Sequence, residues 1–264
     1  MNSLGLRLVL APALIAAASL AGRRWGPTIS GWLIGLPLTS GPIAFLLAVS
    51  YGASFAAASA RGTLAGTISL TVYAVVYAWV ARRYSWPVSV VASSAAFGVV
   101  TLGLQYLTLP LPLLLVCITL TLLIGIRLMP ASAPAAEAPE ASAPPAWDLP
   151  ARMLVSAFFV LLLTGAAAKL GPQLTGLVSP FPIYATILAV FAHQRQGARA
   201  AADVLRGLLM GMVAFVGFFL VVSVLLEPVG IGWAFTLAVV VALLAHGGAL
   251  WALRRRASHA IISQ

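Results

Sequence analysis

The chain has 264 residues, of which 62% are hydrophobic and only 8% are charged, and its mean hydropathy is +1.06. This composition excludes a soluble domain, and apolar runs of about twenty residues recur along the chain, as expected of helices that cross a membrane. The formal net charge of +10 does not indicate nucleic-acid binding, because the arginines are scattered at the ends of the apolar runs. Arginines in such places anchor the topology and meet anionic lipid.

The apolar runs predict an all-α polytopic membrane protein with nine transmembrane helices. They do not alternate apolar and polar residues, which argues against a transmembrane barrel. The first run could be a cleaved signal peptide, but its positive charges, Arg23 and Arg24, follow it, so we expect a retained helix. In chain order the predicted spans are 3–22, 28–50, 61–81, 87–106, 109–128, 151–169, 174–194, 204–226 and 231–253.

The sequence repeats itself at a separation of 145 residues. Residues 26–66 align without a gap on residues 171–211, and 13 of the 41 pairs are identical. The identical residues include Gly, Pro and Arg, which fix backbone shape or carry charge, and not only the Leu and Ala that match by chance. Five predicted spans separate the two repeat starts, and because five is odd, the repeats should cross the membrane in opposite directions. Such an inverted repeat is typical of transporters.

The repeat and the composition divide the chain into five parts. The predicted parts are a first transmembrane repeat (1–107), an extra transmembrane helix (108–128), a disordered Ala/Pro-rich cytoplasmic linker (129–150), a second, inverted transmembrane repeat (151–254) and a cytoplasmic tail (255–264). The arginine-rich loops all fall on one side of the nine-span arrangement, which the positive-inside rule makes cytoplasmic. We therefore expect a multi-pass protein of a bacterial inner membrane, with its N-terminus outside and its C-terminus in the cytoplasm.

Two spans that match under the repeat are interrupted by glycines and prolines. Proline removes a backbone hydrogen bond, so the spans that carry Pro37 or the pair Pro180 and Pro182 are predicted to break within the membrane. Paired broken helices point to a binding site, and their free N–H groups suit an anionic group. The alternative is that the prolines only kink the helices and shape their packing. The candidate substrate-binding residues in these segments are Gly35, Pro37, Thr39, Ser40, Gly41, Pro180, Pro182, Tyr184 and Thr186.

Two arginines at matching positions, Arg61 and Arg206, complete the candidate substrate-binding set. Each precedes a pair of glycines four residues apart, a spacing that predicts close packing of two helices. The arginines could bind an anion or a partner group, or they could snorkel to the membrane interface. His193 and His246 lie near the ends of their spans and are interpreted as interfacial residues, although they could titrate near neutral pH.

The sequence favours a secondary transporter or facilitator that moves a small organic solute by alternating access, and among such solutes it favours an anionic or zwitterionic one. Two alternatives stay open: a flippase or exporter of a lipid-linked or amphiphilic substrate, and a non-transporting membrane subunit that binds a partner protein. No carboxylate falls in the middle of a predicted span, which argues against the carboxylate-based coupling of many antiporters. We expect no enzymatic activity, no catalytic residues, no metal and no cofactor. The expected partners are the lipid bilayer, the solute and, where it forms, a homo-oligomer, but not nucleic acid.

Overall fold

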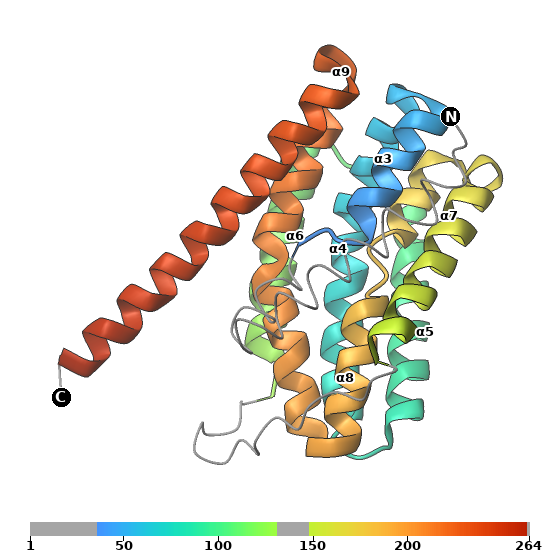
Figure 1. Cartoon of the computed structure of the whole chain (residues 1–264). Coiled ribbons are helices and arrows are strands. Elements are labelled where there is room, and N and C mark those ends of the chain that lie inside the picture. The colour runs from blue at the N-terminus through green and yellow to red at the C-terminus, as the bar shows by residue number, and fades with distance from the viewer. Residues whose placement is uncertain (1–35, 131–147, 263–264) are drawn as a thin grey trace.

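The computed structural model describes residues 36–130 and 148–262, and every regular element in these ranges is an α-helix (Figure 1). Five helical stretches are long and apolar enough to cross a membrane. Large apolar side chains such as Val99 and Leu244 are each 70% exposed, and such a surface suits contact with lipid. The all-α fold of a helical membrane protein is therefore as predicted. The predicted span 3–22 and most of the predicted linker lie outside the described residues.

The helices match the predicted spans in the middle of the chain and differ from them elsewhere. They are α3 (Ser40–Tyr51), α4 (Ala53–Val80), α5 (Trp86–Gln105), α6 (Leu111–Leu128), α7 (Asp148–Val178), α8 (Ile183–Gln196) and α9 (Ala198–Ile262). The bounds of α5 and α6 lie within two residues of the predicted spans 87–106 and 109–128. In contrast, α4 begins eight residues before the predicted span 61–81, and α9 continues through most of the predicted tail.

Two of these helices are divided by a glycine with a positive φ. In α7 this residue is Gly171, with a φ of 74°, and Pro172 follows it. In α9 it is Gly230, with a φ of 80°, two residues after Pro228. Glycine takes up this backbone conformation without the steric cost that a Cβ atom adds, and proline cannot donate to the helix ladder. Each of these helices is therefore two helices joined at one residue.

The break at Gly230 turns α9 into a hairpin. As one straight helix its 65 residues would extend for about 100 Å, more than three times the hydrocarbon thickness of a bilayer. Figure 1 shows α9 reversing its direction, and the ring centroids of Phe218 and Phe235, one on each arm, lie 6.0 Å apart. The two arms correspond to the predicted spans 204–226 and 231–253.

The central helix of the bundle is α4. It contacts α3, α5, α6, α7 and α9, and its side chains Leu64, Tyr73 and Tyr77 are fully buried. The neighbouring α5 and α6 are buried over a much smaller part of their length, so they form part of the outer surface. Because α4 reaches almost every other helix, it positions the groups around the centre of the molecule.

A glycine on α4 allows α7 to approach closely. A Cβ atom added to Gly62 would lie 2.5 Å from the carbonyl oxygen of Gln173, and one added to Gly176 of α7 would lie 2.0 Å from that of Ser59. Both neighbours are backbone atoms, which cannot turn aside as the end of a flexible side chain can. The glycine spacing therefore has its predicted packing role in the first repeat. At Gly207, its counterpart in the second, no described residue lies within 4 Å of an added Cβ.

We predict that Gly62→Ala lowers the stability of the protein by about 1–3 kcal/mol, because the added methyl group overpacks the contact with α7. The measurement is the thermal unfolding midpoint of the purified protein in detergent. Gly103→Ala on α5 is the matched control, since an added Cβ there meets nothing within 4 Å among the described residues. Equal midpoints for the two variants would contradict the close contact between α4 and α7.

Candidate functional site

The two proline-rich breaks predicted from the sequence meet in the structure. α3 begins three residues after Pro37, and α8 begins directly after Pro182. The hydroxyl group of Ser40 donates a hydrogen bond of 2.8 Å to the carbonyl oxygen of Ser179, 139 residues away in the chain. From this meeting point α3 occupies the upper part of the bundle and α8 the lower part (Figure 1). The interrupted segments therefore face each other across the middle of the protein.

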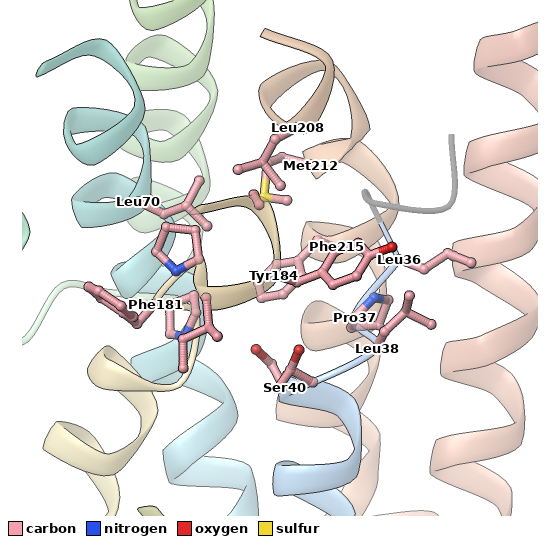
Figure 2. A pocket seen from close by; sticks show the side chains of 15 residues that line it. Leu36, Pro37, Leu38, Ser40, Leu70, Phe181, Tyr184, Leu208, Met212 and Phe215 are labelled. Atoms are coloured by element: carbon pink, nitrogen blue, oxygen red, sulfur yellow. The ribbon is translucent and has the colours of Figure 1, made fainter. Parts of the chain in front are cut away.

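A small cavity of about 50 Å³ lies between the breaks. Figure 2 shows Ser40 and Tyr184 at this cavity, with Leu70 of α4 and Met212 and Phe215 of α9 completing its wall. The lining is therefore mainly apolar, with a few hydroxyl groups from the break residues. The volume admits a few water molecules, whereas pockets for organic ligands usually enclose about 300–1,000 Å³. In the described conformation this space is too small for an organic solute.

Most of the predicted substrate-binding residues lie at or beside this cavity. Gly41 is in the first turn of α3, where an added Cβ atom would lie 3.6 Å from the ring of Phe218. Thr186 is in the first turn of α8, and Gly35 lies outside the described residues. The predicted residues that line the cavity are Pro37, Thr39, Ser40, Pro180, Pro182 and Tyr184.

The backbone around the two breaks has the same geometry at positions 145 residues apart. Gly52 and Gly197, which follow α3 and α8, both have a positive φ, 90° and 87°, with an extended ψ. Several main-chain hydrogen bonds recur at the same spacing. Around the first break, the N–H groups of Leu38, Gly41 and Gly52 donate to the carbonyl oxygens of Leu36, Pro37 and Ala48, respectively. Around the second break, the N–H groups of Ile183, Thr186 and Gly197 donate to those of Phe181, Pro182 and His193.

A row of buried polar groups leads away from the second break. The Thr186 hydroxyl donates to the carbonyl oxygen of Pro182 at 2.7 Å, so the Tyr73 hydroxyl, 2.8 Å from Thr186, is the donor in that pair. One turn further on, the Tyr77 hydroxyl lies 3.5 Å from Nδ1 of His193. These two pairs join α4 to α8 between the cavity and the last turn of α8. We call Tyr73, Tyr77, Thr186 and His193 the polar ladder.

The polar ladder was only partly visible in the sequence. His193 had been interpreted as interfacial, and the two tyrosines had no assigned role. The sequence does contain one sign of the polar ladder. Tyr73 and Tyr77 are four residues apart in a mainly apolar span, and this spacing places both on one helix face. The positions 145 residues after the tyrosines hold Phe218 and Val222, which carry no hydroxyl group.

The two candidate arginines lie away from the central cavity. Arg61 is exposed and borders a separate hollow of about 480 Å³, together with Gln173 and Glu227. Arg206 donates hydrogen bonds to the carbonyl oxygens of Met129 and Pro130, directly after α6. Arg206 thus ties the end of α6 to α9, a role that depends on acceptors far away in the sequence.

The side chain of His246, which the sequence analysis interprets as interfacial, is buried within the protein. It lies on the second arm of α9 with only 3% of its surface exposed. Among the described residues no group of three or more His, Cys, Asp or Glu side chains could hold a metal ion.

No protein-family model, curated protein or solved structure matches this chain. The meeting of the two breaks is therefore the main evidence on function.

We predict that Ser40→Ala destabilises the protein by about 1 kcal/mol or more, because it leaves a buried carbonyl of the second break without its donor. Thermal unfolding in detergent measures the change. The control is Thr119→Val, which removes an exposed hydroxyl that bonds only within its own helix, to Leu115. If Ser40→Ala were no more harmful than this control, the bond to Ser179 would not hold the breaks together.

Proposed function

We propose that this protein is a secondary transporter or facilitator of a small organic solute, and that it works by alternating access. The observation that carries this proposal is the hydrogen bond between Ser40 and Ser179, which joins the start of α3 to the break between α7 and α8 beside one cavity. Irregular backbone is tolerated at membrane depth only where protein buries it or where it lines a cavity. Paired interruptions of this kind mark the binding site in many transporters.

Alternating access is often performed by two similar halves of opposite orientation, and we propose a nine-span protein built from two inverted repeats. The recurrence of main-chain hydrogen bonds at a spacing of 145 residues supports a repeat. The placement of α3 and α8 toward opposite ends of the bundle supports inversion. With the arginine-rich end in the cytoplasm of an inner-membrane protein, the N-terminus lies outside.

The chemistry of the cavity favours an anionic or zwitterionic solute. α3 and α8, of 12 and 14 residues, both begin at the breaks, so the positive ends of two helix dipoles lie beside the cavity. The hydroxyl-bearing residues Thr39 and Tyr184 line the same cavity, the Ser40 oxygen can still accept a hydrogen bond there, and no carboxylate lines the cavity among the described residues. Coupling to an ion would then use hydroxyls, carbonyls or the His193 end of the polar ladder.

The small cavity must widen to admit a solute. The segments at Pro37 and Pro182 are not held by continuous helix ladders, and they are free to change without breaking α4 or α9. Movement of one repeat against the other would open the cavity first to one side and then to the other. The polar ladder lines one of these two routes and supplies it with hydrogen-bonding groups. The other route leads past the first break, where the apolar Phe218 lies.

A second candidate function is a flippase or exporter of an amphiphilic substrate. An apolar groove of about 290 Å³, lined by Pro42, Phe45, Phe218 and Phe235, adjoins the cavity, and Pro37 borders both. A polar headgroup at the break and an acyl chain in this groove would fit such a substrate. The groove favours this function over a subunit that only binds a partner protein.

The test is a ligand screen by thermal unfolding of the purified protein in detergent. The library contains organic anions, amino acids, neutral solutes and alkyl-chain amphiphiles. A ligand at about 100 times its Kd stabilises the folded state by about 2.7 kcal/mol. We expect a small anion or zwitterion to raise the midpoint of the parent protein, and Tyr184→Phe to reduce this shift. Tyr106→Phe, at an 85% exposed position, is the matched control.

The other outcomes separate the candidates. Stabilisation by amphiphiles alone, lost in Phe45→Ala, favours the flippase. A screen without any hit, together with unchanged function in cells of a double Pro37→Ala and Pro182→Ala variant, would reject transport and favour a partner-binding subunit.

A further inference from the structure

A hollow of about 740 Å³ at one end of the bundle is lined by three arginines. Arg82 comes from the turn after α4, Arg127 from the last turn of α6 and Arg199 from the start of α9. All three side chains are exposed, and no carboxylate among the described residues lines the hollow. The nearest acid on α9 is Asp203, one turn after Arg199 and outside the lining. We call this feature the three-arginine hollow.

Specific contacts hold the walls of the three-arginine hollow. The indole N–H of Trp79 donates to the carbonyl oxygen of Leu128 at 2.8 Å, and Arg206 donates to the next two carbonyls. Carbonyl oxygens at a helix C-terminus repel anions, and here donors already occupy them. The guanidinium group of Arg82 lies 4.8 Å from the ring centroid of Trp79, a cation–π contact that orients it. The hollow is therefore positive, and the contacts of Trp79 and Arg206 hold part of its wall.

The hollow at the opposite end of the bundle provides an internal comparison. It is bordered by Ser223, Val224 and Glu227, and each of these lies 145 residues after a residue that lines the three-arginine hollow. There, however, Glu227 stands where the first hollow has Arg82, and it offsets the charge of Arg61. The same place in the fold can thus be nearly neutral, so its shape alone does not require three arginines.

We infer that the three-arginine hollow binds a phosphate group, and that its source is the headgroup of an anionic lipid. Guanidinium groups form paired hydrogen bonds with phosphate oxygens, and three from different helices can surround one phosphate. Tryptophan beside arginine is typical of the membrane interface, where basic pockets between helices receive lipid headgroups. The hollow shares no lining residue with the central cavity, so the inference does not rest on transport.

The test is lipid binding to the full chain in detergent, measured by native mass spectrometry. Phosphatidylglycerol is titrated against phosphatidylcholine, whose headgroup is zwitterionic, and inorganic phosphate is added as a competitor. We expect phosphatidylglycerol to bind more tightly, and each of Arg82→Gln, Arg127→Gln and Arg199→Gln to weaken it about tenfold, the loss expected for one charged hydrogen bond. Arg83→Gln is the matched control, because Arg83 is exposed and adjacent in sequence but does not line the hollow.

Further measurements distinguish a lipid headgroup from free phosphate and separate loss of binding from loss of folding. Competition by inorganic phosphate supports recognition of the phosphate group itself. If inorganic phosphate stabilised the protein saturably, and phosphatidylglycerol bound no more tightly than phosphatidylcholine, the lipid would not be the source of the phosphate. Equal weakening by Arg82→Gln and Arg83→Gln would overturn the site, because it would indicate diffuse attraction. Arg82→Lys keeps the charge but not the guanidinium fork, so a folded variant with weakened binding supports the paired geometry.

Discussion

The structure depends on satisfying backbone polar groups where no water is available. Two segments, around Pro37 and around Pro180 and Pro182, cannot do this through a regular helix ladder. They use short main-chain bonds within each break and the bond from the Ser40 hydroxyl to Ser179 between the breaks. The first break thus supplies a donor to a carbonyl of the second, which requires that they meet. The glycine contact between α4 and α7 makes that meeting possible, because α7 leads directly into the second break.

Similar backbone geometry in the two halves carries different side-chain chemistry. Around the second break Tyr73 and Tyr77 present hydroxyl groups to α8, while the corresponding positions beside the first break hold Phe218 and Val222. In the same way, Arg82 lines the hollow at one end of the bundle, and Glu227, at the corresponding position, lines the hollow at the other end. A shared backbone sets the shape of both halves, and the substitutions on it give the two ends of the molecule different polarity. Such a difference is what a directional process across a membrane needs.

Several features followed from the sequence because they depend on local rules. Glycine and proline act on their own backbone, so paired breaks at matching positions were predictable. The start of α4 was missed because its first residues are mainly Ala and Ser, which form helix well enough but carry little apolar signal. The partners of Arg206 and Tyr73 were not predictable, since they lie just after α6 and on α8, and nothing in the spacing identifies contacts between segments distant in the chain.

One glycine joins each short helix to the long helix after it, Gly52 between α3 and α4 and Gly197 between α8 and α9. Because only Gly197 separates α8 from α9, α8 connects the central cavity to Arg199 over a length of about 20 Å. A solute that shifts α8 would also move one wall of the three-arginine hollow. Thermodynamic linkage is reciprocal, so a headgroup held there would change solute affinity by the same factor. If the protein carries a solute as proposed, the lipid composition of the membrane would therefore affect how tightly it binds that solute.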